Sequence, residues 1–371
     1  MSVYIRATAC ISPQKTFGSV PFLTAPVAYT GNRLGCVEPD YRDLIDGRLM
    51  RRMSRIIKMG VAAASWCLRE ACAVSSPDAI VTGTAFGCLE DTGVFLSRLI
   101  DQQEEMLSPT AFIQSTHNTV GGQIALMLQC HRYNNTFVHR GFSFESALLD
   151  GLLLLEENEA SNVLVGGLDE ITDTSHAIMT RFGLYRRLPV SNFELFAADS
   201  KGTLAGEGAA FFLLTNRPSA NDYARLEGVT TFYKPADVPA IENRILSFLG
   251  SHSIGTGDID LVITGQNGDE KGDTVYRQLQ GTVFKDKVLA PYKHLCGEYP
   301  TSTSFALWLA ANILKTGTVP EVIDSGGRYL DRRDSGNPGE RQNKRRVRRI
   351  LVYNHHQQVH HSLLLISAME G

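Results

Sequence analysis

The residues that first suggest chemistry lie in Asn135–Glu157, where a short strand, a tight turn and an apolar helix follow one another. Thr136–Val138 has the composition of a strand, Gly141 permits a sharp turn, and an apolar helix begins near Phe144. Together they predict a nucleophile elbow, which exposes one side chain at a helix N-terminus where backbone N–H groups favour an anion. The residue at its tip is Ser143 or Gly141, depending on how the turn is counted. The alternative is a buried crossover without chemistry.

A serine at an elbow can accept an acyl group if a neighbouring base activates it. His139 precedes Ser143 by four residues, so an esterase or acyltransferase is one reading of this stretch. The other reading is structural: Ser143 caps the helix and His139 packs at a subunit contact. The sequence around the turn offers no third group that would orient the histidine.

Histidines form a second cluster near the C-terminus, and His356 and His360 would share a face if the segment were helical. The flanking runs, Ile350–Tyr353 and Ser362–Ile366, have the composition of strands, and no Cys, Asp or Glu completes a ligand set. A polar turn is therefore favoured over a metal site, and no metal or cofactor is expected. The cluster consists of His355, His356, His360 and His361.

Composition limits the classes of function. The chain has 371 residues, 43% hydrophobic and 20% charged, with a formal charge of -3 and a pI near 6.4, which describes a globular protein and argues against a nucleic-acid partner. No run approaches the ~18 apolar residues that span a bilayer, and the N-terminus does not resemble a signal peptide. Seven scattered cysteines without a Cys-x-x-Cys pair favour reduced thiols in a cytoplasm.

The elements that must position these residues alternate along the chain. Buried strands and amphipathic helices follow one another in both halves, which predicts a largely parallel, layered α/β fold. The expected strands are 3–11, 79–84, 136–138, 162–167, 206–214, 259–265, 350–353 and 362–366. The expected helices are one beginning near Arg51 and those at 94–106, 118–128, 144–157, 240–249 and 301–314.

Five motifs follow one another along the chain: Arg51–Arg55, Leu107–Pro109, Asn118–Ala125, Val165–Gly167 and Asp199–Ala209. In this order they resemble the β-ketoacyl-acyl-carrier-protein synthases, and the last matches the family's Asp-x-x-x-Gly-x-x-x-Gly-Glu-Gly-Ala segment. The resemblance covers nearly the whole chain and implies a thiolase-like duplicated fold of α-β-α-β-α layers. Its two ketoacyl-synthase-like halves would be residues 1–190 and 191–371, packed as one compact unit.

The resemblance implies a catalytic cysteine at the elbow, because in this family a thiolate attacks the acyl thioester. This chain has Ser143 there, and Cys130 lies well upstream. The family also has a glycine-rich turn near the C-terminus that helps to form an oxyanion hole. The matching residues here, 354–362, contain no glycine.

Two family histidines that assist decarboxylation are also replaced. Gln266 or its neighbour stands at the first position, and Glu298 stands at the second, where the family lysine is kept as Lys293. His294 is expected to point elsewhere. We predict that Gln266 and Glu298 bond to each other and close a vestigial pocket. Ser143, Gln266, Lys293 and Glu298 are therefore degenerate family positions rather than confident catalytic residues.

Ketosynthase relatives with a degraded site occur as chain-length-factor partners of active ketosynthases. This sequence resembles the partner subunits of aryl-polyene and flexirubin-type pigment pathways, so the resemblance implies a heterodimer in polyketide or fatty-acid-type biosynthesis. Residues 134–138 would pair across the dimer and Leu107–Ile113 would line a shared acyl tunnel. The basic run Lys344–Arg349 is either a solvated edge or a docking patch for the acyl carrier protein.

Overall fold

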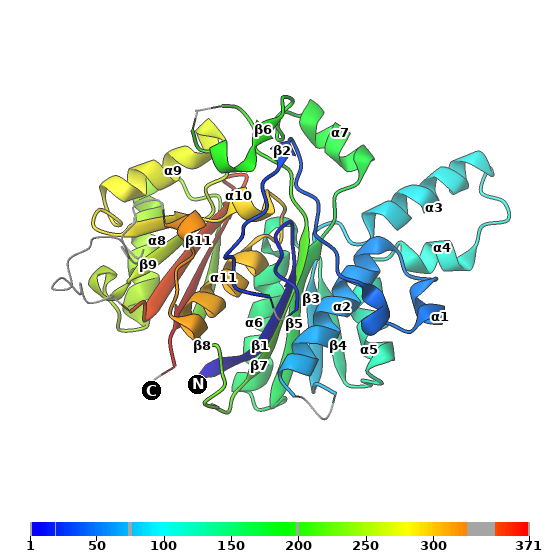
Figure 1. Ribbon diagram of the computed structural model, residues 1–371, viewed down its shortest axis with the longest axis horizontal. Coiled ribbons are helices and arrows are strands. Elements are labelled where there is room, and N and C mark those ends of the chain that lie inside the picture. Colours follow the sequence, from blue (N-terminus) through cyan, green and yellow to red (C-terminus); the bar gives the residue numbers. More distant parts are fainter. Residues whose placement is uncertain (1, 19, 73–75, 198–199, 325–345, 370–371) are drawn as a thin grey trace.

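The computed structural model describes residues 2–18, 20–72, 76–197, 200–324 and 346–369. Strands and helices alternate over this part of the chain (Figure 1). The strands are β1 Val3–Ile11, β2 Thr30–Gly31, β3 Ala79–Gly83, β4 Tyr133–Phe137, β5 Asn162–Asp169, β6 Val190–Ser191, β7 Gly208–Thr215, β8 Ala224–Tyr233, β9 Leu261–Thr264, β10 Val288–Pro291, β11 Arg349–His356 and β12 His360–Ser367. The α-helices are α1 Gly47–Met50, α2 Arg55–Glu70, α3 Leu89–Asp101, α4 Pro109–Gln114, α5 Thr119–Met127, α6 Ser143–Glu156, α7 Asp173–Arg181, α8 Val238–Ser251, α9 Glu270–Gly281, α10 Lys293–Cys296 and α11 Thr303–Thr316.

Ten strands form one sheet in the order β10-β9-β11-β12-β8-β1-β7-β5-β3-β4. From either end inward, two pairings are parallel and the next two are antiparallel, and the two sets of five meet where β1 runs antiparallel to β8. The sheet is therefore a duplicated five-strand unit. The expectation of a largely parallel sheet is wrong for its centre, where the pairings are antiparallel.

The buried apolar residues form three main clusters that define the layers. The largest is centred on α6 and α11, which pack together with strands of both halves. A second cluster joins α2 and α5 to the strands of the first half, and a third joins α8 and α9 to those of the second half. The two five-strand halves of the sheet thus form two layers with α6 and α11 between them and helices outside each, which confirms the α-β-α-β-α prediction.

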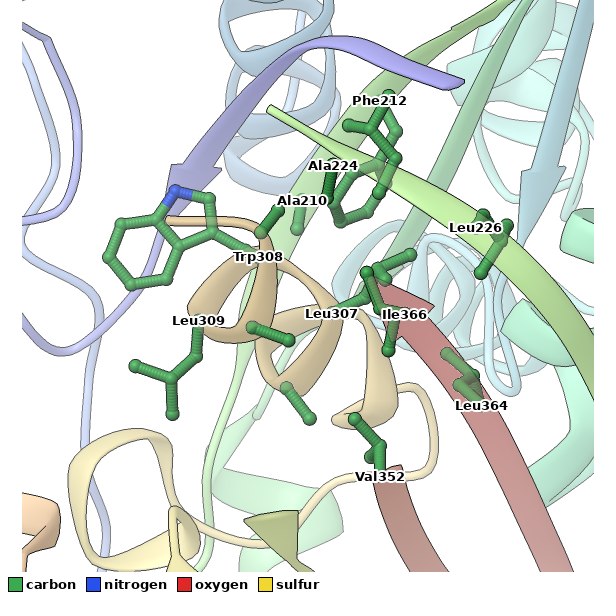
Figure 2. Packing of buried hydrophobic residues seen from close by; sticks show 14 of the residues in the cluster. Ala210, Phe212, Ala224, Leu226, Leu307, Trp308, Leu309, Val352, Leu364 and Ile366 are labelled. Atoms are coloured by element: carbon green, nitrogen blue, oxygen red, sulfur yellow. The ribbon is translucent and has the colours of Figure 1, made fainter. Parts of the chain in front are cut away.

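Helix α11 illustrates how the sequence produces the central layer. Leu307, Leu309 and their neighbours are apolar on all sides, which is expected for a helix enclosed by protein rather than exposed on one face. Figure 2 shows Leu307 among residues of the surrounding strands, including Phe212 and Ile366. The helix ends at Gly317, whose φ of +68° is the left-handed conformation that glycine adopts most readily.

One expected helix lies at other residues than predicted, and part of the basic run lies outside the described residues. The helix expected at 94–106 runs from Leu89 to Asp101, and the chain leaves it through Gln103, Glu104 and Met106, which all have positive φ. Lys344 and Arg345 of the basic run lie outside the described residues.

Among the described helices, none has the length and apolar character to cross a membrane.

Candidate functional site

The expected elbow is present at the end of β4. Residues Arg140–Phe142 form a short 3-10 turn that leads directly into α6, and Arg140 has a φ of 50°, a strained value for a residue with a side chain. Gly141 fits closely under the β11–β12 hairpin, because an added Cβ would lie 2.7 Å from the Cβ of His356. The sequence thus positions the turn against the second half of the molecule.

The hydroxyl of Ser143 is fully buried and used by the turn itself. It accepts a hydrogen bond from the backbone N–H of His139 at 2.8 Å and donates to the carbonyl of Arg140 at 2.8 Å. The ring of His139 does not reach it; its Nδ1 lies 3.5 Å from the hydroxyl of Ser146. Ser143 therefore ties the elbow together, and the proposed Ser143–His139 nucleophile and base are not paired.

A buried ion pair also lies beside the β11–β12 hairpin. Lys293 Nζ donates to Glu298 Oε2 at 2.6 Å, and Lys293 is completely buried. Asn267 Nδ2 donates to the same oxygen at 2.7 Å. Burial opposes ionisation of Glu298, but the Lys293 ammonium and the neighbouring His356 outweigh it and lower the pKa of Glu298 to about 2. Glu298 is therefore an anion at neutral pH.

His356 connects this ion pair to the elbow. Its Nδ1 lies 3.2 Å from Glu298 Oε1, and its Cβ is the atom that contacts Gly141. A cleft of about 220 Å³ remains beside Glu298, Asn267 and His356. Its walls are completed by side chains of α7 and the segment after it, of the loop after β3 and of the β11–β12 turn, among them Phe86, Met179, Leu184, Gln357 and Gln358.

The four C-terminal histidines lie in strands rather than in the turn. His355 is opposite His361 and His356 is opposite His360, so the two pairs face opposite sides of the hairpin. The turn itself is made by Gln357 and Gln358. Burial lowers the pKa of His355 to about 3 and that of His361 to about 4, which keeps both neutral. The helical i, i+4 arrangement considered for a metal is therefore wrong, and the described residues include no group of three or more His, Cys, Asp or Glu suited to a metal ion.

Comparison with known proteins identifies the architecture. Residues 38–191 match the family described as Beta-ketoacyl synthase, N-terminal domain. The remaining strands repeat the order and directions of those in the first half. The chain has a thiolase-like ketosynthase fold. No curated protein sequence matches it.

Solved ketosynthase structures match over the full length. The ishigamide ketosynthase/chain length factor has a TM-score of 0.79 at 17% identity and covers 100% of this chain and 99% of its own. A β-ketoacyl synthase from Burkholderia phymatum has 0.78 at 14%, covering 100% of both chains. The ketosynthase ApeO in complex with its chain length factor ApeC, from Xenorhabdus doucetiae, has 0.75 at 17%, covering 99% of this chain and 98% of that chain. At these identities the matches show the fold of the chain and not its role.

Three of the four expected positions lie around the hairpin, but one pairing differs. Lys293 and Glu298 form the buried pair, and Ser143 lies at the elbow. Gln266 does not bond to Glu298; its Oε1 accepts from Thr264 Oγ1 at 3.0 Å, and the next residue, Asn267, makes the bond instead. The expected closure is also wrong, because the cleft remains next to Glu298.

His294 points away, as expected, and its Nε2 lies 3.1 Å from the carbonyl of Val322. Burial lowers its pKa to about 4.

Two residues of the site have roles that the sequence pattern does not predict. The sequence predicts His356 in a polar turn, whereas it lies in β11, where alternation with His355 places the two side chains on opposite faces. Glu145, in the first turn of α6, is fully buried, and its carboxyl oxygens have no hydrogen-bond partner of normal geometry. Burial raises its pKa, although the nearby hydroxyls of Thr303 and Ser362 oppose the shift. The available sign of a functional group was a carboxyl in the first turn of α6, next to apolar residues of the same helix.

Proposed function

We propose that this chain is a non-catalytic, chain-length-factor-like subunit that pairs with an active ketosynthase and shapes its acyl tunnel. The observation that carries the proposal is the ion pair between Lys293 and Glu298, combined with a serine at the elbow whose hydroxyl is bonded to the backbone. The similarity to structures of ketosynthase and chain length factor complexes supports this reading.

The residues present do not fit decarboxylative condensation. That reaction needs hydrogen-bond donors aimed at a developing enolate, and it must accommodate a malonyl carboxylate. Glu298 is ionised, so it has no proton to donate and repels a second carboxylate. The amide of Asn267 donates to Glu298 rather than into the cleft. Gln357 and Gln358 replace the glycine-rich turn.

Two buried cysteines, Cys296 and Cys88, do not replace the missing nucleophile. Cys296 is the nearest in sequence to Glu298, but it is fully buried, and burial holds its pKa well above the ordinary thiol value. Cys88 at the start of α3 is also buried, and burial again raises its thiol pKa. Neither supplies a thiolate at neutral pH.

Two features support a partner at the β4 end of the sheet. β4 is the last strand in the sheet order, so one of its edges is not paired within the described chain. The helices α3 and α4 project beside this end (Figure 1). They expose large apolar side chains. Phe112 is 57% exposed and Ile113 61%, which fits the proposal that Leu107–Ile113 lines a tunnel shared with the partner.

Two further proposals concern the biosynthetic pathway and the cellular compartment of the chain. From the sequence resemblance we assign the chain to aryl-polyene or flexirubin-type synthesis in the cytoplasm, with the acyl carrier protein docking on the complex. All seven cysteines are unpaired thiols, which agrees with a reducing compartment.

The decisive experiment measures carrier-protein-dependent elongation by the purified chain, by the co-expressed ketosynthase and by their complex. We expect products only when the ketosynthase has its cysteine, and no acyl mass on this chain after exposure to an acyl thioester. Ile113→Trp should shorten the product of the complex, whereas Leu246→Trp, at an exposed position on α8, should not. Elongation by this chain alone, or acylation of Ser143, would refute the proposal.

A further inference from the structure

The segment from Leu89 to Thr119 forms a helical hairpin that stands apart from the core. It contains α3 and α4, and none of its side chains is buried. Its two helices hold each other through Phe95 and Phe112, whose ring centroids are 5.6 Å apart. The position of this hairpin therefore depends on contacts at its base rather than on burial of an apolar face.

Those basal contacts bring both ends of the hairpin together. Gly87, with a φ of +64°, lies so close to His117 that an added Cβ would be 2.9 Å from its Cα. The hydroxyl of Thr92 donates to the carbonyl of Ser115 at 3.1 Å. These contacts form a narrow hinge at which the hairpin meets the body.

One side chain of the body reaches the first turn of α3 at this hinge. Glu170 follows β5, is only 5% exposed, and its Oε1 accepts the backbone N–H of Glu90 at 3.0 Å. The same turn carries Asp91, whose Oδ2 is buried; burial raises the pKa of Asp91, although the nearby hydroxyl of Ser54 opposes the shift. Two carboxyl groups therefore meet at the base of the hairpin.

The cation that favours ionisation of Glu170 is Arg55, and its guanidinium is already paired. Arg55 on α2 donates to both oxygens of Glu207, at 2.7 and 2.5 Å, and to Glu38 at 2.5 Å. Glu170 thus faces Glu90 and Asp91 on α3, Arg55 on α2 and Glu207 before β7. Carboxylates outnumber the guanidinium, so a charge on Glu170 is poorly compensated.

We propose that Glu170 is a pH-dependent latch for the α3–α4 hairpin. The neutral acid keeps its bond to the N–H of Glu90 without a repulsive charge and holds the hairpin against the body. The ionised form is buried beside Asp91 and Glu207, and this favours opening at the hinge, where Glu170 regains water.

The direction in which pH changes the opening of the hairpin follows from the titration of Glu170. Burial, assisted by Asp91, raises its pKa from 4.5 to about 7, although the Glu90 N–H and Arg55 oppose the shift. Because the pKa of Glu170 is higher in the closed state, closure is fully favoured below about pH 4.5 and becomes weaker as the pH rises to about 7. The hairpin should therefore open more readily at pH 8 than at pH 5.5.

The inference goes beyond the proposed function and does not depend on it, since it concerns the isolated chain. Hydrogen exchange of residues 90–116, corrected for the intrinsic pH dependence of exchange, measures the opening constant. From pH 5.5 to 8 we expect a rise of roughly 10- to 30-fold. Glu170→Gln should abolish this rise. Glu104→Gln is the matched control, because it removes the same charge from the exposed tip and should leave the rise unchanged.

A second variant tests the proposal even if Glu170→Gln does not fold. Asp91→Asn removes the neighbouring charge while Glu170 remains, so the midpoint of the opening transition should move to lower pH. The proposal is overturned if the wild-type hairpin shows no pH-dependent opening. It is also overturned if Glu170→Gln, folded as judged by circular dichroism, retains the wild-type response, or if Asp91→Asn leaves the midpoint in place.

Discussion

At the scale of single residues, Glu298 is the carboxylate on which the buried polar contacts of the site converge. Its two oxygens are shared among an ammonium, an amide and an imidazole from Lys293, Asn267 and His356. These donors come from three separate segments, so the carboxylate joins α10, the loop after β9 and the β11–β12 hairpin. Glu298 therefore acts as a polar cross-link within the protein.

The variant Glu298→Gln tests this role. It leaves Lys293 buried without a counter-charge, and removing one member of a buried pair costs about 3–5 kcal/mol of unfolding free energy. Urea denaturation at pH 7 measures the loss. Lys293→Met combined with Glu298→Gln should recover most of it, because no uncompensated charge remains.

The same comparison has a defined pH dependence. The pKa of Glu298 is lowered to about 2 in the folded chain. Its contribution to the unfolding free energy is therefore complete above about pH 4.5 and disappears as the pH falls toward 2. The difference between wild type and Glu298→Gln should shrink over this window. An undiminished difference at pH 3 would contradict the cross-link.

At the scale of elements, the β11–β12 hairpin determines the shape of the cleft. Gln357 and Gln358 have φ values of 54° and 57°, and the N–H of Val359 donates to the carbonyl of His356 at 3.1 Å. Positive φ at both central residues is the geometry of a type I′ turn, which Asn-Gly adopts with much less strain than Gln-Gln. The turn therefore stores strain next to Glu298.

Replacing the turn by Gln357→Asn with Gln358→Gly should relieve this strain and raise the unfolding free energy by roughly 1 kcal/mol. Thermal and urea unfolding measure the gain. The control is Gln278→Gly in the exposed interior of α9, which should instead lose about 1 kcal/mol because glycine is unfavourable in a helix. A destabilised turn variant would show that the glutamine side chains make compensating contacts.

The elements also show how far sequence reasoning reaches. The elbow, β5 and α2 follow from local patterns, because apolar periodicity and turn residues determine them directly. The choice between Gln266 and Asn267 does not, since it depends on the phase of a loop that turns at Gly268 with a φ of +78°. A shift of one residue there decides which amide reaches Glu298.

At the scale of the whole molecule, the two halves are joined by backbone and by side chains. Val3, Tyr4 and Ile5 of β1 pair with residues 224–226 of β8, so one sheet crosses the boundary. The central core contains residues of both α6 and α11. We propose, as expected from the sequence, that the halves form one compact cooperative unit.

The two tryptophans of the chain allow a direct test, because Trp66 lies in α2 of the first half and Trp308 in α11 of the second. Trp66→Phe and Trp308→Phe each leave one fluorophore. In each variant we expect the urea midpoint from fluorescence to coincide with that from far-UV circular dichroism, because neither half can lose its packing without exposing the shared core. Comparing both signals within one variant removes the effect of the substitution on stability. Separate midpoints would mean that α2 or α11 unfolds on its own and that the halves behave as independent units.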